Sequence, residues 1–310
     1  MSHSVNENPP ALPAYVLVTP ARNEAELIAF TIESVVAQTA RPLKWVIVSD
    51  GSTDGTDDIV RQYAAKHDWI ELLCMPERPE RHFAGKVMAL NAGRVRVEAL
   101  PYQVIACLDA DITFQSDYFS FLLSRLAADP QLGLVGTPYI DATSEIYDYR
   151  FVSTDNVSGA CQVFRRECFD EIGGYVLVKG GAIDTIAALT ARMKGWKTRT
   201  FIDKICLHHR SIGAAQSGPI EARFILGKRD YAIGNHPLWE LFRATYQMIK
   251  RPFVMRGLAL AAGYIWASVR YSQRPVSREL VAFRRREQMS RLSSLLTRGR
   301  VSDHLSVPSQ

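Results

Sequence analysis

Short apolar runs alternate with longer amphipathic segments through the first half of the chain. The runs predict strands at 15–18, 45–48 and 70–73 and a fourth strand that ends at Asp109. The segments between them repeat apolar residues at helical spacing and predict helices over 24–38, 55–66 and 85–97. Strands that alternate with helices of this length are typical of a doubly wound, mostly parallel α/β sheet.

The second half follows the same pattern less regularly. It predicts helices over 116–128, 168–172 and 184–194, an apolar strand region over 132–140, and short strands near 197–201 and 205–207. Ser116 is the expected N-cap of the first of these helices. From Pro219 onward the chain is predicted to be helical and amphipathic, with a break at 235–237.

The most apolar late segment, Gly257–Val269, lies between Arg256 and Arg270. A helix needs about 20 apolar residues to cross a bilayer, and this segment is shorter. We therefore expect a buried or interfacial helix here.

Composition divides the chain into four parts. The polar, proline-rich residues 1–13 lack the apolar core of a signal peptide and predict a disordered lead. We expect a folded α/β core over 14–215, amphipathic helices that can associate with a membrane over 216–275, and a basic tail over 276–310.

The net charge of +5 is concentrated near the C-terminus, where nine arginines and three acidic residues follow Val269. A basic tail behind an apolar helix favours an anionic lipid surface over nucleic acid as the partner. The five cysteines form no C-x-x-C pair and mostly lie in apolar runs, which favours reduced thiols in a cytoplasmic protein.

Two carboxylates, Asp109 and Asp111, follow the apolar run 104–107. The carboxyl end of a strand is where open α/β sheets bind ligands. Two carboxylates this close repel each other unless a cation or a proton lies between them. Oxygen ligands of this kind suit Mg²⁺ or Mn²⁺ that holds a diphosphate.

Two further segments carry candidate ligand groups. The strand 45–49 runs into D-G-S-T-D-G-T (50–56), where Asp50 can accept hydrogen bonds from a ligand, although this is also a generic turn sequence. Gly85 and Lys86 open a predicted helix, and free N–H groups with an ammonium favour a phosphate there. A solvated basic loop is the alternative interpretation of Gly85-Lys86.

Four motifs occur in a fixed order: V-T-P-A-R-N-E (18–24), V-S-D-G-S-T-D-G-T (48–56), G-K-x-x-A-L-N-A-G (85–93) and L-D-A-D (108–111). Together they resemble the family 2 glycosyltransferases of the GT-A fold, over roughly residues 15–210. The resemblance implies a GT-A-type, doubly wound, mixed and mostly parallel sheet in the core, followed by a C-terminal amphipathic helical extension. It also implies an inverting transferase that uses a sugar nucleotide.

The resemblance assigns candidate roles to individual residues. Contacts to the nucleotide or sugar are expected from Pro20, Ala21, Glu24, Asp50, Gly85, Lys86, Asn91 and Asp109. A Mg²⁺ or Mn²⁺ ion is expected at Asp109 and Asp111, with His209 as the assigned third ligand. Strand alternation lets only one of His208 and His209 face the site, and the sequence leaves open which one does so.

The general base is expected to be Asp184, at the start of the predicted helix 184–194. In relatives a carboxylate pair opens this helix, and its second member is the base. Here Ile183 stands in the first position, so a neighbouring acid that could orient or tune Asp184 is missing. Without the resemblance, Asp184 would be interpreted as a helix N-cap.

The implied reaction moves a sugar from a nucleotide-diphosphate sugar, with UDP favoured, to an acceptor hydroxyl. A saccharide, or a lipid-linked saccharide in cell-surface polysaccharide synthesis, is the expected acceptor, and the inner face of the plasma membrane is the expected location. One alternative is a haloacid-dehalogenase-like phosphatase, because residues 109–113 also fit D-x-D-x-T. The other is an inactive sugar-nucleotide-binding scaffold, for which Ile183 is the hint.

Overall fold

The computed structural model describes residues 11–77, 83–141, 153–178, 181–210 and 218–297. The first ten residues of the expected lead and the end of the expected basic tail lie outside the described residues. Contacts divide the chain into one unit over 1–215 and a second over 216–310, and each is described by itself.

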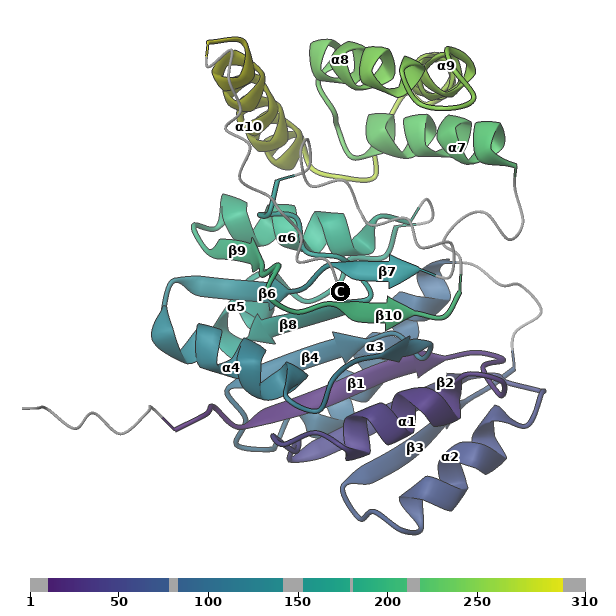
Figure 1. Cartoon of the computed structure of the whole chain (residues 1–310), viewed down its shortest axis with the longest axis vertical. Coiled ribbons are helices and arrows are strands. Elements are labelled where there is room, and N and C mark those ends of the chain that lie inside the picture. The colour runs from purple at the N-terminus through teal and green to yellow at the C-terminus, as the bar shows by residue number, and fades with distance from the viewer. Residues whose placement is uncertain (1–10, 78–82, 142–152, 179–180, 211–217, 298–310) are drawn as a thin grey trace, which may run out of the picture. The chain divides into compact units, whose positions relative to one another are not determined.

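Seven strands form the main sheet of the first unit (Figure 1). They are β1 (Tyr15–Ala21), β2 (Lys44–Asp50), β3 (Ile70–Met75), β4 (Val104–Leu108), β6 (Leu132–Gly136), β8 (Cys161–Arg165) and β9 (Lys197–Thr200). Their order is β3-β2-β1-β4-β8-β6-β9, and every neighbouring pair is parallel except those that β8 makes with β4 and β6. The expected mixed, mostly parallel sheet is confirmed.

The sequence pattern missed β8, which lies in the middle of the sheet. Its sequence, C-Q-V-F-R, places a glutamine and an arginine among apolar residues, so the strand lacks a clear apolar run. Gln162 is nevertheless fully buried and lies opposite Cys107 of β4. Burial on both faces, rather than local sequence preference, fixes this strand.

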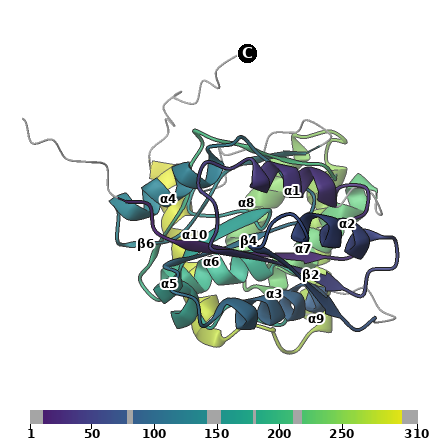
Figure 2. The same ribbon diagram turned by 90° about the horizontal axis from the view of Figure 1, so that it is seen from below.

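In the described part of the first unit, six helices cover the two faces of the sheet. They are α1 (Ile28–Val36), α2 (Thr56–Ala64), α3 (Phe83–Val97), α4 (Tyr118–Ala128), α5 (Arg166–Glu171) and α6 (Ile183–Met193). Figure 2 shows α1 and α4 on one side of the sheet and α3, α5 and α6 on the other, and the two apolar cores follow the same division, with α2 joining α1 and α4. The predicted helices are all present. α1, α2 and α4 are shorter than predicted, whereas α3, α5 and α6 begin one or two residues earlier than predicted.

The start of α4 differs from the prediction. Its N-cap is Asp117 rather than Ser116, and the Asp117 side chain makes no capping hydrogen bond. The Ser116 carbonyl accepts the Thr39 N–H instead, and the Asp117 carboxylate pairs with Lys204. These tertiary contacts keep Ser116 outside the helix.

A second, small sheet adjoins the carboxyl end of β4. It consists of β5 (Ile112–Thr113), β10 (Cys206–His208) and β7 (Tyr139–Asp141), in the order β5-β10-β7. β10 is antiparallel to β5 and places His208 opposite Ile112, one residue beyond Asp111. This pairing brings two segments that are distant in the sequence to the same carboxylates.

Over residues 218–297 the second unit has four helices: α7 (Pro219–Ala232), α8 (Pro237–Met248), α9 (Met255–Arg270) and α10 (Arg278–Thr297). The expected break at 235–237 and the expected helix over 257–269 are present, whereas α10 lies in the segment expected only as a basic tail. Among the described residues, none of the helices combines the length and the apolar character needed to cross a membrane.

Glycines allow α9 to approach α7 and α8 closely. A Cβ atom added at Gly263 or Gly227 would collide with backbone atoms of the facing helix, the Phe224 carbonyl and the Leu260 carbonyl respectively. A Cβ atom at Gly257 would collide with the Ala244 carbonyl in α8. Small residues at helix crossings permit this backbone contact.

Buried polar groups join the four helices of this unit around Asn235, whose side chain is fully buried. The Asn235 Oδ1 atom accepts hydrogen bonds from Arg284 Nε (2.5 Å) and Gln288 Nε2 (2.8 Å) in α10. Its Nδ2 group donates to Glu240 Oε2 at 3.0 Å, and its carbonyl accepts the Tyr264 hydroxyl at 2.7 Å. Buried hydrogen bonds of this kind specify how the helices pack.

Candidate active site

The expected ligand groups lie at one edge of the main sheet. β1 runs parallel to both β2 and β4, so their carboxyl ends meet at this edge. Pro20, Asp50 and Asp109 are at or next to these ends. Parallel pairing thus gathers residues from three motifs that are separated in the sequence.

Asp109 faces the start of α3. It continues the alternation of Ile105 and Cys107, whose side chains belong to the core beneath α3, and its carboxylate Oδ1 lies 2.5 Å from Lys86 Nζ. Burial raises the pKa of Asp109, and the negative charge of Asp111 raises it further. The positive charge of Lys86 lowers it, but the pKa of Asp109 remains above its usual value. Burial alone would lower the pKa of Lys86, but the surrounding carboxylates, first of all Asp109, raise it overall.

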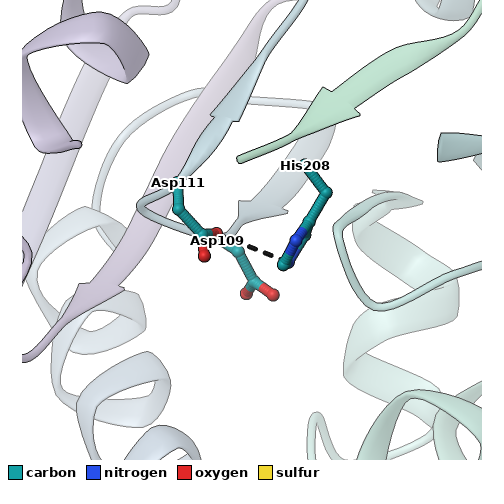
Figure 3. A group of neighbouring side chains, drawn as sticks. All are labelled: Asp109, Asp111 and His208. Carbon is teal, nitrogen blue, oxygen red and sulfur yellow. Dashed lines mark ion pairs between the residues drawn. The ribbon is translucent and has the colours of Figure 1, made fainter. Parts of the chain in front are cut away.

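Asp109, Asp111 and His208 form a group that could hold a metal ion (Figure 3). One ligand atom from each residue lies within 4.8 Å of the others, and His208 Nε2 is 3.6 Å from Asp111 Oδ1. The Asp111 and His208 side chains are both about nine-tenths buried. Two carboxylate oxygens and one imidazole nitrogen fit Mn²⁺, and the oxygens also suit Mg²⁺.

His208, and not His209, joins the carboxylates, so the assignment of His209 is corrected on geometry. Along β10 the side chains alternate, with Cys206 and His208 buried and Leu207 exposed, and His209 therefore faces away. The His209 ring lies 2.9 Å from Thr113 Oγ1 and stacks on Phe30. The backbone carbonyl of Arg210 contacts Nδ1 of His208 and helps to orient its ring.

The loops after β1 and β2 are tied together beside this group. Hydrogen bonds join the Glu24 N–H to Thr56 Oγ1 (2.8 Å) and the Ala25 N–H to Asp54 Oδ2 (2.9 Å). Asp50 is buried, and its carboxylate lies 3.8 Å from Arg22 Nη1. Hydrogen bonds thus fix the D-G-S-T-D-G-T segment to the loop after β1.

Glu24 makes an ion pair that the sequence did not indicate. Both of its carboxylate oxygens contact Arg210, at 2.7 Å and 2.9 Å, although 186 residues separate the two. Arg210 directly follows the two histidines, so this pair links the loop after β1 to the segment that carries His208. Residues 211–217, which follow Arg210, lie outside the described part of the chain.

Asp184 and Asp109 line the same small pocket. Asp184 is the second residue of α6, and Ala182 before it adopts a left-handed backbone conformation (φ 63°). Contributions to the pocket wall come from β1, α3, β4, the segment before β8 and α6. The lining residues are Pro20, Lys86, Leu90, Cys107, Leu108, Asp109, Gly159, Tyr175, Ile183 and Asp184.

Of the eleven expected site residues, Pro20, Lys86, Asp109 and Asp184 line this pocket and the other seven do not. Ala21 is buried in the core, and Gly85 is buried in the first turn of α3. Asn91 is exposed on α3, because five residues of helix rotate it by about 140° from Lys86, which does line the pocket. The structure therefore does not bring Asn91 to the carboxylates.

Comparison with known proteins agrees with this geometry. Residues 16–151 match the sequence model described as glycosyl transferase family 2. The poly-beta-1,6-N-acetyl-D-glucosamine synthase of Staphylococcus aureus strain COL is 31% identical over 125 residues, which are 40% of this chain and 28% of that protein. The synthase of Staphylococcus epidermidis is 30% identical over the same shares. The chain thus spans little more than a quarter of the length of these relatives.

Solved structures share the fold. The mannosyltransferase PcManGT of Pyrobaculum calidifontis, solved with GDP-Man and Mn²⁺, has a TM-score of 0.58 at 20% identity, over 94% of this chain and 82% of that chain. Residues 1–349 of TarS from S. aureus give a TM-score of 0.50 at 12% identity, over 84% and 72% of the two chains. The family match includes Asp109 and Asp111 and favours the glycosyltransferase over the phosphatase interpretation. Residues 16–151 are therefore similar to the family 2 glycosyltransferases, and the α/β unit has the GT-A fold.

Proposed function

We propose that the protein is an inverting glycosyltransferase that moves a sugar from a nucleotide-diphosphate donor to an acceptor hydroxyl, with Asp184 as the general base. The observation that carries this proposal is the pocket shared by Asp184, Asp109 and Lys86. A base on one side of a sugar site and cationic groups on the other are what a single displacement requires.

The residues at the carboxyl end of β4 fit a divalent ion. Asp109, Asp111 and His208 would hold Mn²⁺ or Mg²⁺, and the raised pKa of Asp109 agrees with a carboxylate pair in need of a cation. When bound, the ion would supply Lewis-acid stabilisation of the diphosphate leaving group. Lys86 contributes a further positive charge beside Asp109.

The proton of the acceptor hydroxyl passes to the Asp184 carboxylate. As it leaves, the acceptor oxygen forms a bond to the anomeric carbon, and the bond from that carbon to the diphosphate oxygen breaks. The products are the glycoside, with inverted anomeric configuration, and the nucleoside diphosphate. A transition state of oxocarbenium character is expected, as in glycoside hydrolysis.

Glu24, Asp50 and Pro20 are the proposed contacts to the nucleotide. Glu24 and Asp50 lie in the connected loops after β1 and β2, and Pro20 lines the pocket. UDP is the favoured nucleotide. This agrees with the names of the staphylococcal synthases, whose product is a polymer of N-acetylglucosamine. GDP is the alternative, since PcManGT was solved with GDP-Man.

Substitution of Asp184 tests the function. We would screen UDP-N-acetylglucosamine and GDP-mannose with Mn²⁺ by thermal shift and then follow release of the nucleoside diphosphate. Asp184→Asn should reduce this release at least 100-fold and leave the donor Kd within about twofold. Asp203→Asn, at an exposed aspartate outside the pocket, is the matched control. Turnover by Asp184→Asn near the wild-type rate would overturn the assignment of the base. If the wild-type protein binds the donor but shows no turnover with any of a broad panel of acceptors, an inactive scaffold is favoured.

We further propose a saccharide acceptor that is linked to a lipid, reached from the inner face of the plasma membrane. The connection between α8 and α9 supports membrane association. Ile249, Phe253, Val254, Met255 and Leu258 are each about half or more exposed there. Between Glu240 and Glu279 the chain has seven lysine or arginine residues and no acidic one.

Exposed apolar side chains flanked by cations match the surface of an anionic bilayer. The test is flotation with phosphatidylglycerol vesicles, with phosphatidylcholine vesicles as the neutral reference. Ile249→Ser combined with Phe253→Ser should abolish flotation, whereas Val95→Ser, which removes an equally exposed apolar side chain from α3, should not. Flotation of the double variant at the wild-type level would refute this surface.

A further inference from the structure

Ile183, which stands where relatives have an acid, is part of the core beneath α6. Its side chain is only 5% exposed and belongs to the same apolar cluster as Val157, Tyr175 and Ala187. Ile183 also lines the pocket with Lys86 and Asp184, but its side chain offers no polar atom to Asp184. The group that orients Asp184 must therefore lie elsewhere.

Gln162, in the middle of β8, reaches the start of α6. Its Nε2 group donates to the Asp184 carbonyl at 3.3 Å and to the Val157 carbonyl at 3.1 Å. Its Oε1 atom accepts the Tyr175 hydroxyl at 2.6 Å. Gln162 is fully buried and Tyr175 nearly so, so water does not compete for these hydrogen bonds.

The hydrogen bonds fix the orientation of the amide. Two backbone carbonyls can only accept, so the NH₂ group must face Asp184 and Val157, and Oε1 must face the hydroxyl. Burial raises the pKa of Tyr175 well above its usual value, which keeps the hydroxyl protonated and able to donate. Tyr175 thus holds Gln162 in the orientation that binds the Asp184 backbone.

The same strand is connected to the carboxylate side of the pocket. Gln162 lies opposite Cys107 in the β4–β8 pair, and the Asp109 N–H donates to the Ala160 carbonyl at 3.0 Å. The start of β8 therefore contacts both ends of the reaction site: Ala160, the residue before the strand, binds the Asp109 backbone, and Gln162 binds the Asp184 backbone. A strand in the middle of a sheet is a rigid spacer between two such groups.

Gly159 shows how closely Asp184 is held against the segment before β8. A Cβ atom at Gly159 would lie 3.1 Å from both the Cβ atom and the Oδ2 atom of Asp184. Only a glycine leaves this space without displacing the carboxylate. The Asp184 side chain thus packs against Gly159 on one side and faces the pocket on the other.

We propose that Gln162 and Tyr175 are positioning residues that hold Asp184 in place, a task that a neighbouring acid cannot perform in this chain. The inference rests on the proposed function of Asp184 as the base. It predicts that loss of either hydrogen bond lowers the rate of the chemical step without weakening donor binding. Reacting groups displaced by about 1 Å can lose on the order of 100-fold in rate.

The test uses Tyr175→Phe and Gln162→Met, which keep the volume of the side chain and remove its hydrogen bonds. With UDP-N-acetylglucosamine and Mn²⁺, kcat for UDP release should fall at least tenfold in each variant, with the donor Kd unchanged within twofold. Amide hydrogen exchange over residues 183–190 should become faster in both, in the absence of any donor. Tyr118→Phe is the matched control, because it removes a buried hydroxyl that bonds to Thr137 instead.

The outcomes separate this inference from the proposed function. If Asp184→Asn is inactive while Tyr175→Phe and Gln162→Met keep the wild-type kcat and the wild-type exchange, the positioning role is refuted and the base remains. If Asp184→Asn is active, the base assignment fails, and the exchange measurement still decides whether Gln162 holds α6. Equal losses in Tyr118→Phe would mean that general destabilisation explains the result, and this would also refute the proposal.

Discussion

Nε2 of His208 lies 3.6 Å from Oδ1 of Asp111, although 97 positions separate the two residues in the chain. Antiparallel pairing of β10 with β5 creates this proximity, because His208 is opposite Ile112. The neighbouring His209 takes part in a different contact, with Thr113 on the other side of the strand.

The two histidines should therefore differ in metal binding. His208→Ala should weaken Mn²⁺ binding by at least tenfold, which is about 1.4 kcal/mol, because one of three ligand groups is lost. His209→Ala should change it less than twofold. Calorimetric titration with Mn²⁺ alone measures both variants, and a loss confined to His209→Ala would reverse the assignment.

Gly159→Ala should lower the turnover of a protein that remains folded. The added methyl group would lie 3.1 Å from Asp184, so the carboxylate must move by a few tenths of an ångström or more. We expect kcat for nucleotide release to fall on the order of tenfold, with the melting temperature nearly unchanged. Gly195→Ala is a poor control because of its positive φ, whereas Gly218→Ala meets no atom within 4 Å and serves well. An unchanged kcat would mean that Asp184 tolerates displacement.

Stability should depend on pH through Glu240 in the second unit. Burial raises the pKa of Glu240 to about 7 from the usual 4.5, Asp230 adds to the rise, and Arg243 opposes it. The folded state therefore binds more protons than the unfolded state between these values, so the free energy of unfolding falls as the pH rises from about 4.5 to 7.

Glu240→Gln should reduce this slope and stabilise the protein at pH 8, by on the order of 2 kcal/mol. Hydrogen exchange over residues 237–248 of the full chain, measured between pH 5 and 8, reports on this unit. Glu279→Gln, at an exposed residue of α10, should leave the slope as it is. A wild-type slope in Glu240→Gln would contradict the prediction.

Gly263→Leu should disrupt the packing of α9 on α7. Its side chain has no room, because a Cβ atom already meets the Phe224 carbonyl, and the backbone of α7 would have to move. Overpacking of this kind costs about 3 kcal/mol. Ala262→Leu places the same side chain at the preceding, exposed position and should be tolerated. The midpoints of urea unfolding of the two variants measure this difference. Equal midpoints would show that α9 and α7 are not closely packed at Gly263.

Local patterns predicted most of the first unit. Apolar runs such as 15–18 and 45–48 became β1 and β2 because strands buried on both faces need continuous apolar sequence. The helices between them followed from their spacing. The pattern failed at β8, where Gln162 is buried by its hydrogen bonds rather than by apolar character. It gave no bounds for α10, whose polar sequence carries no clear apolar face.

The sequence by itself determined the candidate ligand-binding and catalytic residues Asp50, Lys86, Asp109 and Asp184, because each stands at a strand end or helix start within an ordered set of motifs. Only the tertiary structure decided which of them meet. The choice of His208 over His209, the Arg210–Glu24 pair and the Gln162–Tyr175 support for Asp184 all join segments far apart in the chain. Local preference carries no information about such contacts, since they depend on strand pairing and on which face each side chain takes.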